Sequence, residues 1–363
     1  MKFGIVGPIS KDHVVLPSGT KVDKYGAIAY STLALAKLVE DTPDQIICLS
    51  HVARADFDAI EKLLRHPNIS LSYVMDGIAT KGTEIELIYI NQQERIGRQI
   101  STMSPITAAE LVLLKDCESV LLMPLNESDI TLACAIELRR VSTAFILLDV
   151  HGLVTTVNET GNRVNQPWQN AEKWFACIDV LKMNAKEVPW VAGHYIDQDQ
   201  DYVDYAISVV QHGVTACWIT FGDQSSLIAW RREGRFYWAK VPVVTDIGSV
   251  VDTTGCGDSA SAGFMYSYAR LQNPLIAVTI GNTLGSLKAS FQGFNGFPSP
   301  PEVRGMMQDH YKNYLHQLLD DVLFKSQLMI HEVKGECKDE SFMFNPDGNR
   351  HHYGSDYAGG SHS

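Results

Sequence analysis

The most informative segment of the chain is residues 252–264, which reads DTTGCGDSASAGF. Within it, Gly255 and Gly257 flank Cys256 immediately before a helix-like run that continues to about Leu271. Glycines let the backbone turn tightly and aim successive N–H groups at one point. The helix that follows adds its unpaired N-terminal donors and the positive end of its dipole. The segment therefore predicts an anion hole of main-chain donors, suited to the charge on a transferring phosphoryl group.

Asp258 stands at the mouth of this predicted anion hole. A carboxylate there can accept the proton of an attacking hydroxyl, which is the task of a base in phosphoryl transfer. Alternatively, an Asp at this place is an ordinary helix N-cap, which is a frequent role of Asp. The complete string DTTGCGD is far more specific than Gly-x-Gly-Asp alone, and it favours the base.

Short apolar runs alternate with amphipathic stretches along the chain before this segment. The apolar runs predict buried strands at residues 3–6, 46–49, 119–123, 144–150 and 216–220. The amphipathic stretches predict helices at residues 27–39, 56–64, 107–114 and 132–141. Repeated strand–helix alternation indicates an α/β fold with a mostly parallel sheet covered by helices on both sides.

Two helix-poor stretches, residues 12–25 and about 70–103, interrupt this alternation. The second contains TEIELIYI at residues 83–90, an alternating pattern typical of a half-exposed strand. We expect these stretches to form a small projecting sheet, which either folds over a ligand or pairs with a second subunit.

The end of the chain has a different composition. We expect a main domain over residues 1–325 and an extension over residues 326–363, largely disordered from about residue 338 because little apolar periodicity remains there. His351, His352 and His362 lie in this extension without partners at metal-ligand spacing, so a metal site is not expected.

The composition also limits the classes of function. The formal charge is 30 − 42 = −12 and no block rich in Lys or Arg occurs, so a nucleic-acid partner is not expected. No apolar run approaches the roughly 18–20 residues needed to cross a bilayer, and the first residues lack a secretory signal pattern. The seven cysteines are scattered without a C-x-x-C pair, which disfavours a disulfide framework or a zinc site. We therefore expect a cytoplasmic protein.

The string DTTGCGD resembles the signature of the ribokinase-like (PfkB) family of carbohydrate and nucleoside kinases, and the resemblance covers about residues 3–300. It implies a three-layer α/β/α fold with a small β-sheet lid. It also implies transfer of a phosphoryl group from ATP to a hydroxyl of a sugar, nucleoside or related polyol. In that reading Asp258 is the base and the backbone of Gly255, Cys256 and Gly257 forms the anion hole.

Two further segments match the acceptor side of this family. Residues 7–12, GPISKD, resemble its first strand and turn, and the resemblance implies that Asp12 holds hydroxyls of the acceptor. Residues 26–30, GAIAY, resemble its N-terminal glycine motif, which implies that Gly26 and Tyr30 lie at the acceptor. A solvated turn is the alternative for Asp12. Arg98 is a further candidate for substrate binding because Arg suits phosphate or carboxylate recognition; a solvated hairpin turn is its alternative.

Other segments match the donor side. Asn184 and Glu187 resemble the Asn-x-x-Glu element that orders Mg²⁺ and its waters, Glu187 acting through water; a capping box is the alternative. The family's nucleotide contacts are carried over to Thr220, Gly222 and Asn282. The surroundings of Asp252 correspond to the place where the family binds a monovalent cation such as K⁺; a turn-initiating Asp is the alternative.

The sequence departs from the family pattern at four positions. Tyr25 replaces the first of two glycines, Tyr30 an asparagine, Ala260 a phenylalanine and Ser225 a glycine. The two tyrosines fall at the acceptor pocket, where they could stack on a ring or narrow the pocket. Two readings follow: an active kinase, which the resemblance suggests could be a homodimer through the lid sheet, or a non-catalytic member of the fold that binds a metabolite or a partner.

Overall fold

The computed structural model describes residues 1–75, 81–90, 95–319 and 330–333, which all belong to one structural unit, Met1–Val333. The boundary expected near residue 325 and the extension from residue 338, with its three histidines, lie outside the described residues. No helix among those residues has the length and apolar character needed to cross a membrane.

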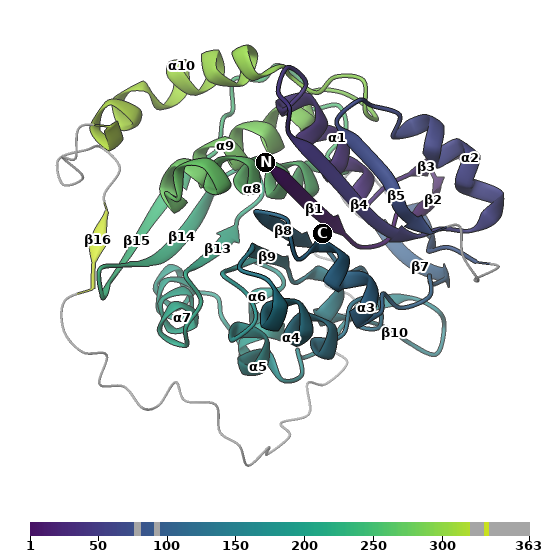
Figure 1. The fold of residues 1–363 in the computed structure, drawn as a ribbon, viewed down its shortest axis with the longest axis horizontal. Coiled ribbons are helices and arrows are strands. Elements are labelled where there is room, and N and C mark those ends of the chain that lie inside the picture. The colour runs from purple at the N-terminus through teal and green to yellow at the C-terminus, as the bar shows by residue number, and fades with distance from the viewer. Residues whose placement is uncertain (76–80, 91–94, 320–329, 334–363) are drawn as a thin grey trace, which may run out of the picture. The chain divides into compact units, whose positions relative to one another are not determined.

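A ten-stranded sheet forms the centre of this unit (Figure 1). Its strand order is β16-β15-β14-β13-β12-β9-β8-β1-β4-β5. The strands are β1 Lys2–Val6, β4 Gln45–His51, β5 Ile69–Met75, β8 Ser119–Leu122, β9 Phe145–Asp149, β12 Val180–Asn184, β13 Ala216–Thr220, β14 Ser225–Arg232, β15 Arg235–Pro242 and β16 His331–Glu332. All pairings from β13 to β5 are parallel, and β14, β15 and β16 add an antiparallel edge. The predicted mostly parallel sheet is confirmed.

Helices cover both faces of this sheet (Figure 1). One face carries α1 Ile28–Leu38, α2 Arg54–Leu63, α8 Cys256–Leu271, α9 Pro274–Ala289 and α10 Pro300–Leu319. The other carries α3 Ala108–Leu111, α4 Leu132–Val141, α5 Ala171–Phe175, α6 Val188–Ala192 and α7 Asp199–Gln211. Because side chains of a strand alternate between faces, Leu121 enters the first core and Val120 and Leu122 enter the second. Both faces are buried, which explains the continuous apolar runs of the sequence.

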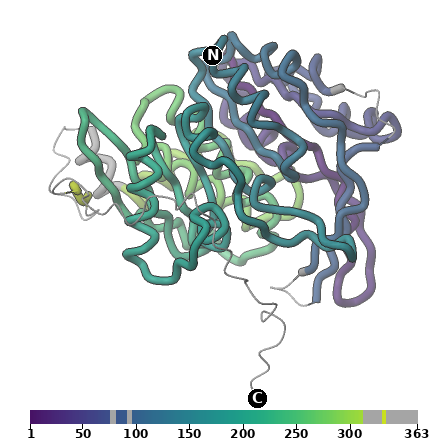
Figure 2. The backbone as a smooth tube through the Cα atoms, turned by 90° about the horizontal axis from the view of Figure 1, so that it is seen from below, coloured from purple at the N-terminus to yellow at the C-terminus, as the bar shows by residue number. Residues whose placement is uncertain are grey.

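A separate four-stranded sheet has the order β3-β2-β6-β7. It consists of β2 Lys11–Val15, β3 Lys21–Tyr25, β6 Glu84–Tyr89 and β7 Arg95–Ser101. Figure 2 shows its β2–β3 hairpin, in purple, projecting beyond the main body of the chain. The predicted small sheet is confirmed, but the start of the second predicted stretch belongs elsewhere: β5 pairs with β4 at the edge of the central sheet. A hairpin of β10 Thr155–Val157 and β11 Arg163–Asn165 adjoins β7 through a bridge between Arg98 and Asn162.

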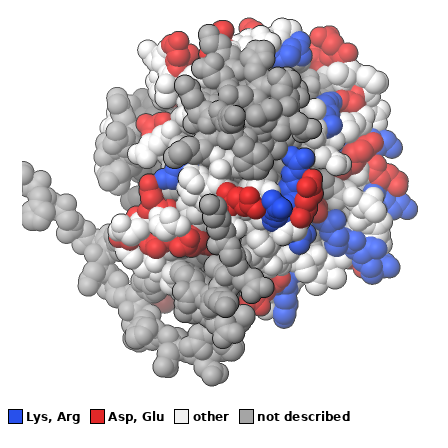
Figure 3. Space-filling model, turned by 90° about the vertical axis from the view of Figure 1, so that its left-hand side faces the viewer, with Lys and Arg blue, Asp and Glu red and all other residues white. Residues whose placement is uncertain are grey.

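Charged side chains of both signs are interspersed among the described residues on the face shown in Figure 3. The strand β15, in the antiparallel edge of the central sheet, contributes two ion pairs. Arg235 pairs with Glu332 at 3.3 Å, and Lys240 pairs with Asp199 at 2.5 Å. Exposed pairs of this kind contribute little to stability. They do keep this edge from carrying a single sign of charge.

Candidate active site

A cleft of about 430 Å³ opens where the parallel strands end and α8 begins. Parallel α/β sheets place their ligand sites at the carboxyl ends of the strands, because the loops there leave a crevice. The cleft is lined by seven of the residues singled out in the sequence: Asp12, Asn184, Glu187, Thr220, Gly255, Gly257 and Asp258. These residues come from four separate segments of the chain, and the fold brings them together.

The loop before α8 has the geometry that the glycines predict. Gly255 has φ +83°, a left-handed conformation that favours glycine, and a Cβ there would lie 2.3 Å from the ring of Tyr30. A Cβ on Gly257 would lie 3.2 Å from Nζ of Lys182. As first-turn amides, the N–H groups of Gly257 and Asp258 have no acceptor within the helix, and they lie at its positive end. The loop can therefore stabilise an anion.

The carboxyl group of Asp258 lies at this helix start and lines the cleft. Burial raises its pKa to about 7; the Lys182 ammonium opposes the rise and the Asp149 carboxylate adds to it. A hydrogen bond from Oγ of Ser31 to the Asp258 carbonyl, at 2.8 Å, ties this turn to α1. A carboxyl group with a pKa near 7 can take up and release a proton at neutral pH.

A buried ion pair between Lys182 and Asp149, which was not predicted from the sequence, contacts the first turn of α8. Nζ of Lys182 lies 2.6 Å from Oδ2 of Asp149 and donates a hydrogen bond to the carbonyl of Gly257 at 3.1 Å. The hydroxyl of Ser261 can donate its proton to Oδ2 of Asp149 or to the carbonyl of Gly257, which lie 3.3 and 3.1 Å away. Burial lowers the pKa of Lys182, but Asp149 more than offsets that effect and the pKa is raised. A charged residue inside the apolar strand β12, two positions before Asn184, was the available signal.

Asn184 and Glu187 adopt the capping arrangement that was their alternative reading. Oδ1 of Asn184 accepts the N–H groups of Lys186 and Glu187, at 2.9 and 3.1 Å, and Oε2 of Glu187 accepts the N–H of Asn184 at 2.8 Å. Oε1 of Glu187 lies 2.8 Å from Nδ1 of His151, another cleft residue that was missed. Among the described residues no three His, Cys, Asp or Glu side chains form a direct metal site. The Glu187 carboxylate still lines the cleft, so it fits a metal held through water and phosphate.

The opposite side of the cleft is lined by Asp12 and by Ile85, Leu87 and Gly97 of the small sheet. Arg163 of β11 enters here and was not anticipated; it donates to Gln99, Asn126 and the Leu125 carbonyl, at 2.5, 3.0 and 2.6 Å. Gly26 is needed beside Asp12, since a Cβ would lie 2.5 Å from Oδ2 of that carboxylate. A further bond, from Nζ of Lys24 to Oγ1 of Thr254 at 3.1 Å, connects the small sheet to the loop before α8.

The remaining predicted residues do not line the cleft. Tyr30 is fully buried beneath Gly255, and the hydroxyl of Tyr25 donates to Asp56 at 3.1 Å, so neither tyrosine narrows the acceptor pocket. Arg98 is exposed, because side chains alternate along β7 and it is Gly97 that faces the cleft.

Gly222, Asn282 and Cys256 also lie outside the lining of the cleft, and each has a structural role. Gly222, with φ +64°, forms the turn between β13 and β14. The amide of Asn282 is buried and bonds to Ser226 and to the carbonyls of Val241 and Pro242, which attaches α9 to β14 and β15. Cys256 lies between the two glycines as the first residue of α8, and burial raises the pKa of its thiol to about 11.

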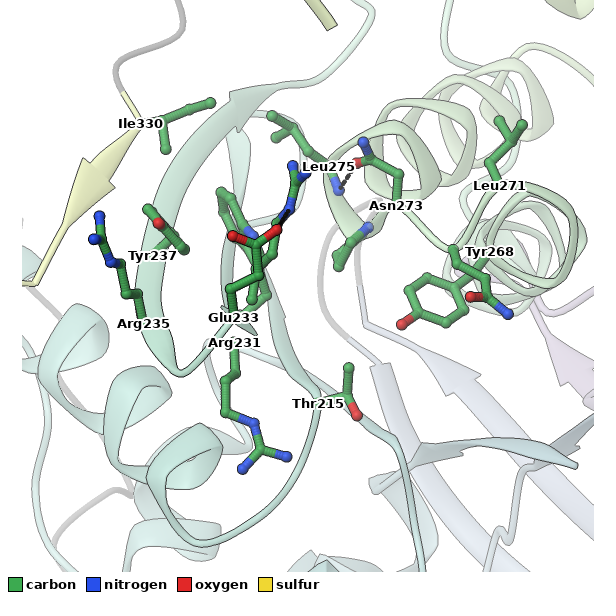
Figure 4. A pocket seen from close by; sticks show the side chains of 14 residues that line it. Thr215, Arg231, Glu233, Arg235, Tyr237, Tyr268, Leu271, Asn273, Leu275 and Ile330 are labelled. Atoms are coloured by element: carbon green, nitrogen blue, oxygen red, sulfur yellow. Dashed lines mark hydrogen bonds and ion pairs between the residues drawn. The ribbon is translucent and has the colours of Figure 1, made fainter. Parts of the chain in front are cut away.

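A larger cavity, of about 600 Å³, lies at the far end of α8, where α8 ends and α9 begins (Figure 4). Its side chains are largely engaged with their neighbours: Arg235 pairs with Glu332 at 3.3 Å, and Oδ1 of Asn273 accepts two N–H groups at the start of α9. Thr215, before β13, lines this cavity, whereas Thr220 at the other end of β13 lines the cleft. The larger cavity is therefore separate from the site described above.

Residues 55–300 of the chain match the model of the pfkB family carbohydrate kinases. A comparison with curated protein sequences gives no match.

Three solved structures illustrate the similarity of fold. A pyrophosphate-dependent kinase in the ribokinase family, complexed with a pyrophosphate analog and myo-inositol, has a TM-score of 0.64 and 22% identity, covering 84% of this chain and 100% of that chain. Ribokinase of Arabidopsis thaliana, complexed with ribose and ATP, has a TM-score of 0.69 and 16% identity, with 84% and 98% covered. A nucleoside kinase of Methanocaldococcus jannaschii has a TM-score of 0.61 and 18% identity, with 85% and 98% covered.

Proposed function

Since this chain belongs to the pfkB family of carbohydrate kinases, we propose that it transfers the γ-phosphoryl group of ATP to a hydroxyl of a small sugar, nucleoside or related polyol. The observation that carries this proposal is the position of Asp258. Its carboxyl group lies beside main-chain donors at the start of α8, in a cleft that also holds Asp12 on one side and Asn184 and Glu187 on the other.

In the proposed reaction, the acceptor hydroxyl lies between Asp258 and the terminal phosphorus of the donor. Asp258 takes the hydroxyl proton, the hydroxyl oxygen forms a bond to phosphorus, and the bond between phosphorus and the β–γ bridging oxygen breaks to release ADP. The N–H groups of Gly257 and Asp258 hold the charge on the transferring group. Asp258 then loses its proton to solvent. Asp12 and the small sheet hold and cover the acceptor.

The residues near Glu187 fit a magnesium ion held through water. When bound there, Mg²⁺ supplies positive charge that neutralises the donor phosphates. Glu187 is fixed for this role by Asn184 on one side and His151 on the other, and Thr220 at the end of β13 lies at the same edge of the cleft.

An assay with a panel of acceptors tests the proposed activity. We expect ADP to form from ATP with members of one class among sugars, nucleosides and cyclic polyols, because the cleft offers hydroxyl-binding carboxylates beside a phosphate-binding loop. The same panel with pyrophosphate as donor distinguishes a nucleotide-dependent from a pyrophosphate-dependent enzyme, since a structural neighbour is described as using pyrophosphate. A panel that yields thermal stabilisation without phosphoryl transfer from either donor would instead favour the non-catalytic reading.

The pH profile tests the role of Asp258 as base. Only the ionised carboxylate accepts a proton, and its pKa is raised to about 7, so kcat/KM is expected to rise with pH through about 7 and to level off above it. The measurement is kcat/KM from pH 5 to 9 at constant ionic strength. The residual activity of Asp258→Asn should lack this inflection; an unchanged inflection in that variant would assign the titration to another group.

A further inference from the structure

The ammonium group of Lys288, near the C-terminal end of α9, is buried directly behind the loop that leads into α8. The side chain is fully buried, and Nζ donates hydrogen bonds to the carbonyls of Asp252 and Phe291, at 3.3 and 3.0 Å. Oδ2 of Asp252 lies 4.0 Å from the same Nζ. Two main-chain carbonyls and one carboxylate thus converge on a single positive charge.

The surroundings of this ammonium keep it in place. The N–H groups of Val251 and Asp252 both donate to the carbonyl of Ala289, at 2.7 and 3.2 Å, so the two loops that surround Nζ are joined. The rings of Tyr30 and Phe291 have their centroids 5.3 and 4.8 Å from Nζ, within the range of cation–π attraction. Burial lowers the pKa of Lys288, and the Asp252 carboxylate opposes that effect.

These oxygens are the kind that bind an alkali cation, but they do not leave room for one. Carbonyl and carboxylate oxygens replace the hydration shell of K⁺ in protein sites. Here the point on which they converge is occupied by Nζ of Lys288, and Lys24 approaches the same Asp252 carboxylate at 3.8 Å. A cation at that point would place a further buried positive charge against an ammonium without an additional anion. The expected K⁺ site beside Asp252 therefore does not fit.

We propose that Lys288 is a built-in replacement for the monovalent cation, and that its ammonium fixes the loop before α8 in the shape that holds the donor phosphates. An ammonium group is close to K⁺ in size and charge, and it is tethered here by a side chain. The fixed loop reaches the site in two steps: Oδ1 of Asp252 accepts the N–H of Thr254 at 2.9 Å, and Gly255 follows directly. Lys288 is thus a positioning residue, and this inference rests on the proposed kinase function.

The wild-type protein provides the first test. We expect turnover, KM for the phosphoryl donor and the melting temperature to be the same in KCl, NaCl and tetramethylammonium chloride at equal ionic strength, turnover agreeing within about twofold. A rise in turnover of fivefold or more that is specific to K⁺ would overturn the proposal. The melting temperature requires no phosphoryl transfer, so K⁺-specific stabilisation would also overturn it even if the protein is not a kinase.

Two matched variants provide the second test. Lys288→Ala leaves a space lined by the three oxygens, whereas Lys288→Met fills that space with an apolar chain of similar length. Measured in NaCl, both are expected to lose at least tenfold in turnover. Adding K⁺ or methylammonium to Lys288→Ala should raise its turnover at least threefold, lower KM for the donor and raise the melting temperature. Lys288→Met should show none of these effects.

The contrast between the variants separates positioning by charge from simple packing. Equal responses of both variants to K⁺ and Na⁺ would contradict the proposal, because a missing charge would then not be what the added cation replaces. If Lys288→Ala does not fold in NaCl, refolding in KCl supports the proposal. If it folds in neither salt, the comparison of KCl with NaCl on the wild-type protein decides.

Discussion

Replacing Asp258 with asparagine is expected to lower turnover by at least ~10²-fold while the protein remains folded. The side chain lies in the cleft, and the amide keeps its size and shape but cannot accept the hydroxyl proton. The measurement is the steady-state rate at saturating donor and acceptor, together with the affinity for the donor, which should change little. Near-normal turnover in this variant would remove Asp258 from the role of base.

Stability provides a control for this variant. Burial raises the pKa of Asp258 in the folded protein, so ionisation opposes folding and stability falls as pH rises from the unfolded-state pKa of about 4 through 7. Asparagine carries no charge, so Asp258→Asn should melt at a higher temperature than the wild type at pH 8. Asp199→Asn, at an exposed carboxylate that pairs with Lys240, should change neither turnover nor this pH dependence.

Replacing Lys182 with methionine is expected to lower the free energy of unfolding by about 3–5 kcal/mol, because the Asp149 carboxylate would remain buried without its partner. The Gly257 carbonyl would also lose one of its side-chain hydrogen-bond donors, so turnover should fall as well. Denaturant titration measures the first effect. The steady-state rate at saturating donor and acceptor measures the second, since Gly257 lies in the loop that we propose as the phosphate site.

The double variant Lys182→Met with Asp149→Asn separates the ion pair from packing. Removing both charges removes the penalty of an unpaired buried carboxylate, so the double variant should be more stable than Lys182→Met alone. If instead the effects of the two single variants simply add, Lys182 and Asp149 are not coupled, and the account of the buried pair is wrong.

The sequence predicted the layout of the fold because its signals are local. Buried parallel strands produce continuous apolar runs, and the glycine-rich string before α8 carries its own backbone geometry. The prediction differs from the structure mainly in which sheet one strand joins. β5 lies in the helix-poor stretch predicted to form the small sheet, but it pairs with β4 of the central sheet.

The site was predicted less completely because its members depend on register and on distant partners. Arg98 and Gly97 are neighbours in sequence, yet only the pairing of β7 decides which one faces the cleft. Tyr30 lies on the face of α1 that packs beneath Gly255, a contact that requires knowledge of where α8 lies. Lys182 and Asp149 lie on adjacent strands, and their role as an ion pair can be recognised only once the pairing of β9 with β12 is known. A motif therefore identifies candidate positions, and the packing of the folded chain determines which of those side chains can contact a ligand.

The hydrogen bond between Lys24 and Thr254 has a consequence for the order of events during turnover. It joins the small sheet to the loop before α8, which in the proposed reaction contact the acceptor and the donor phosphates, so ordering of one favours ordering of the other. Two substrates that engage such a linked pair do not bind independently: whichever arrives first pays part of the ordering entropy for the second. Reciprocity of coupled equilibria then requires each to tighten the other's affinity by the same factor.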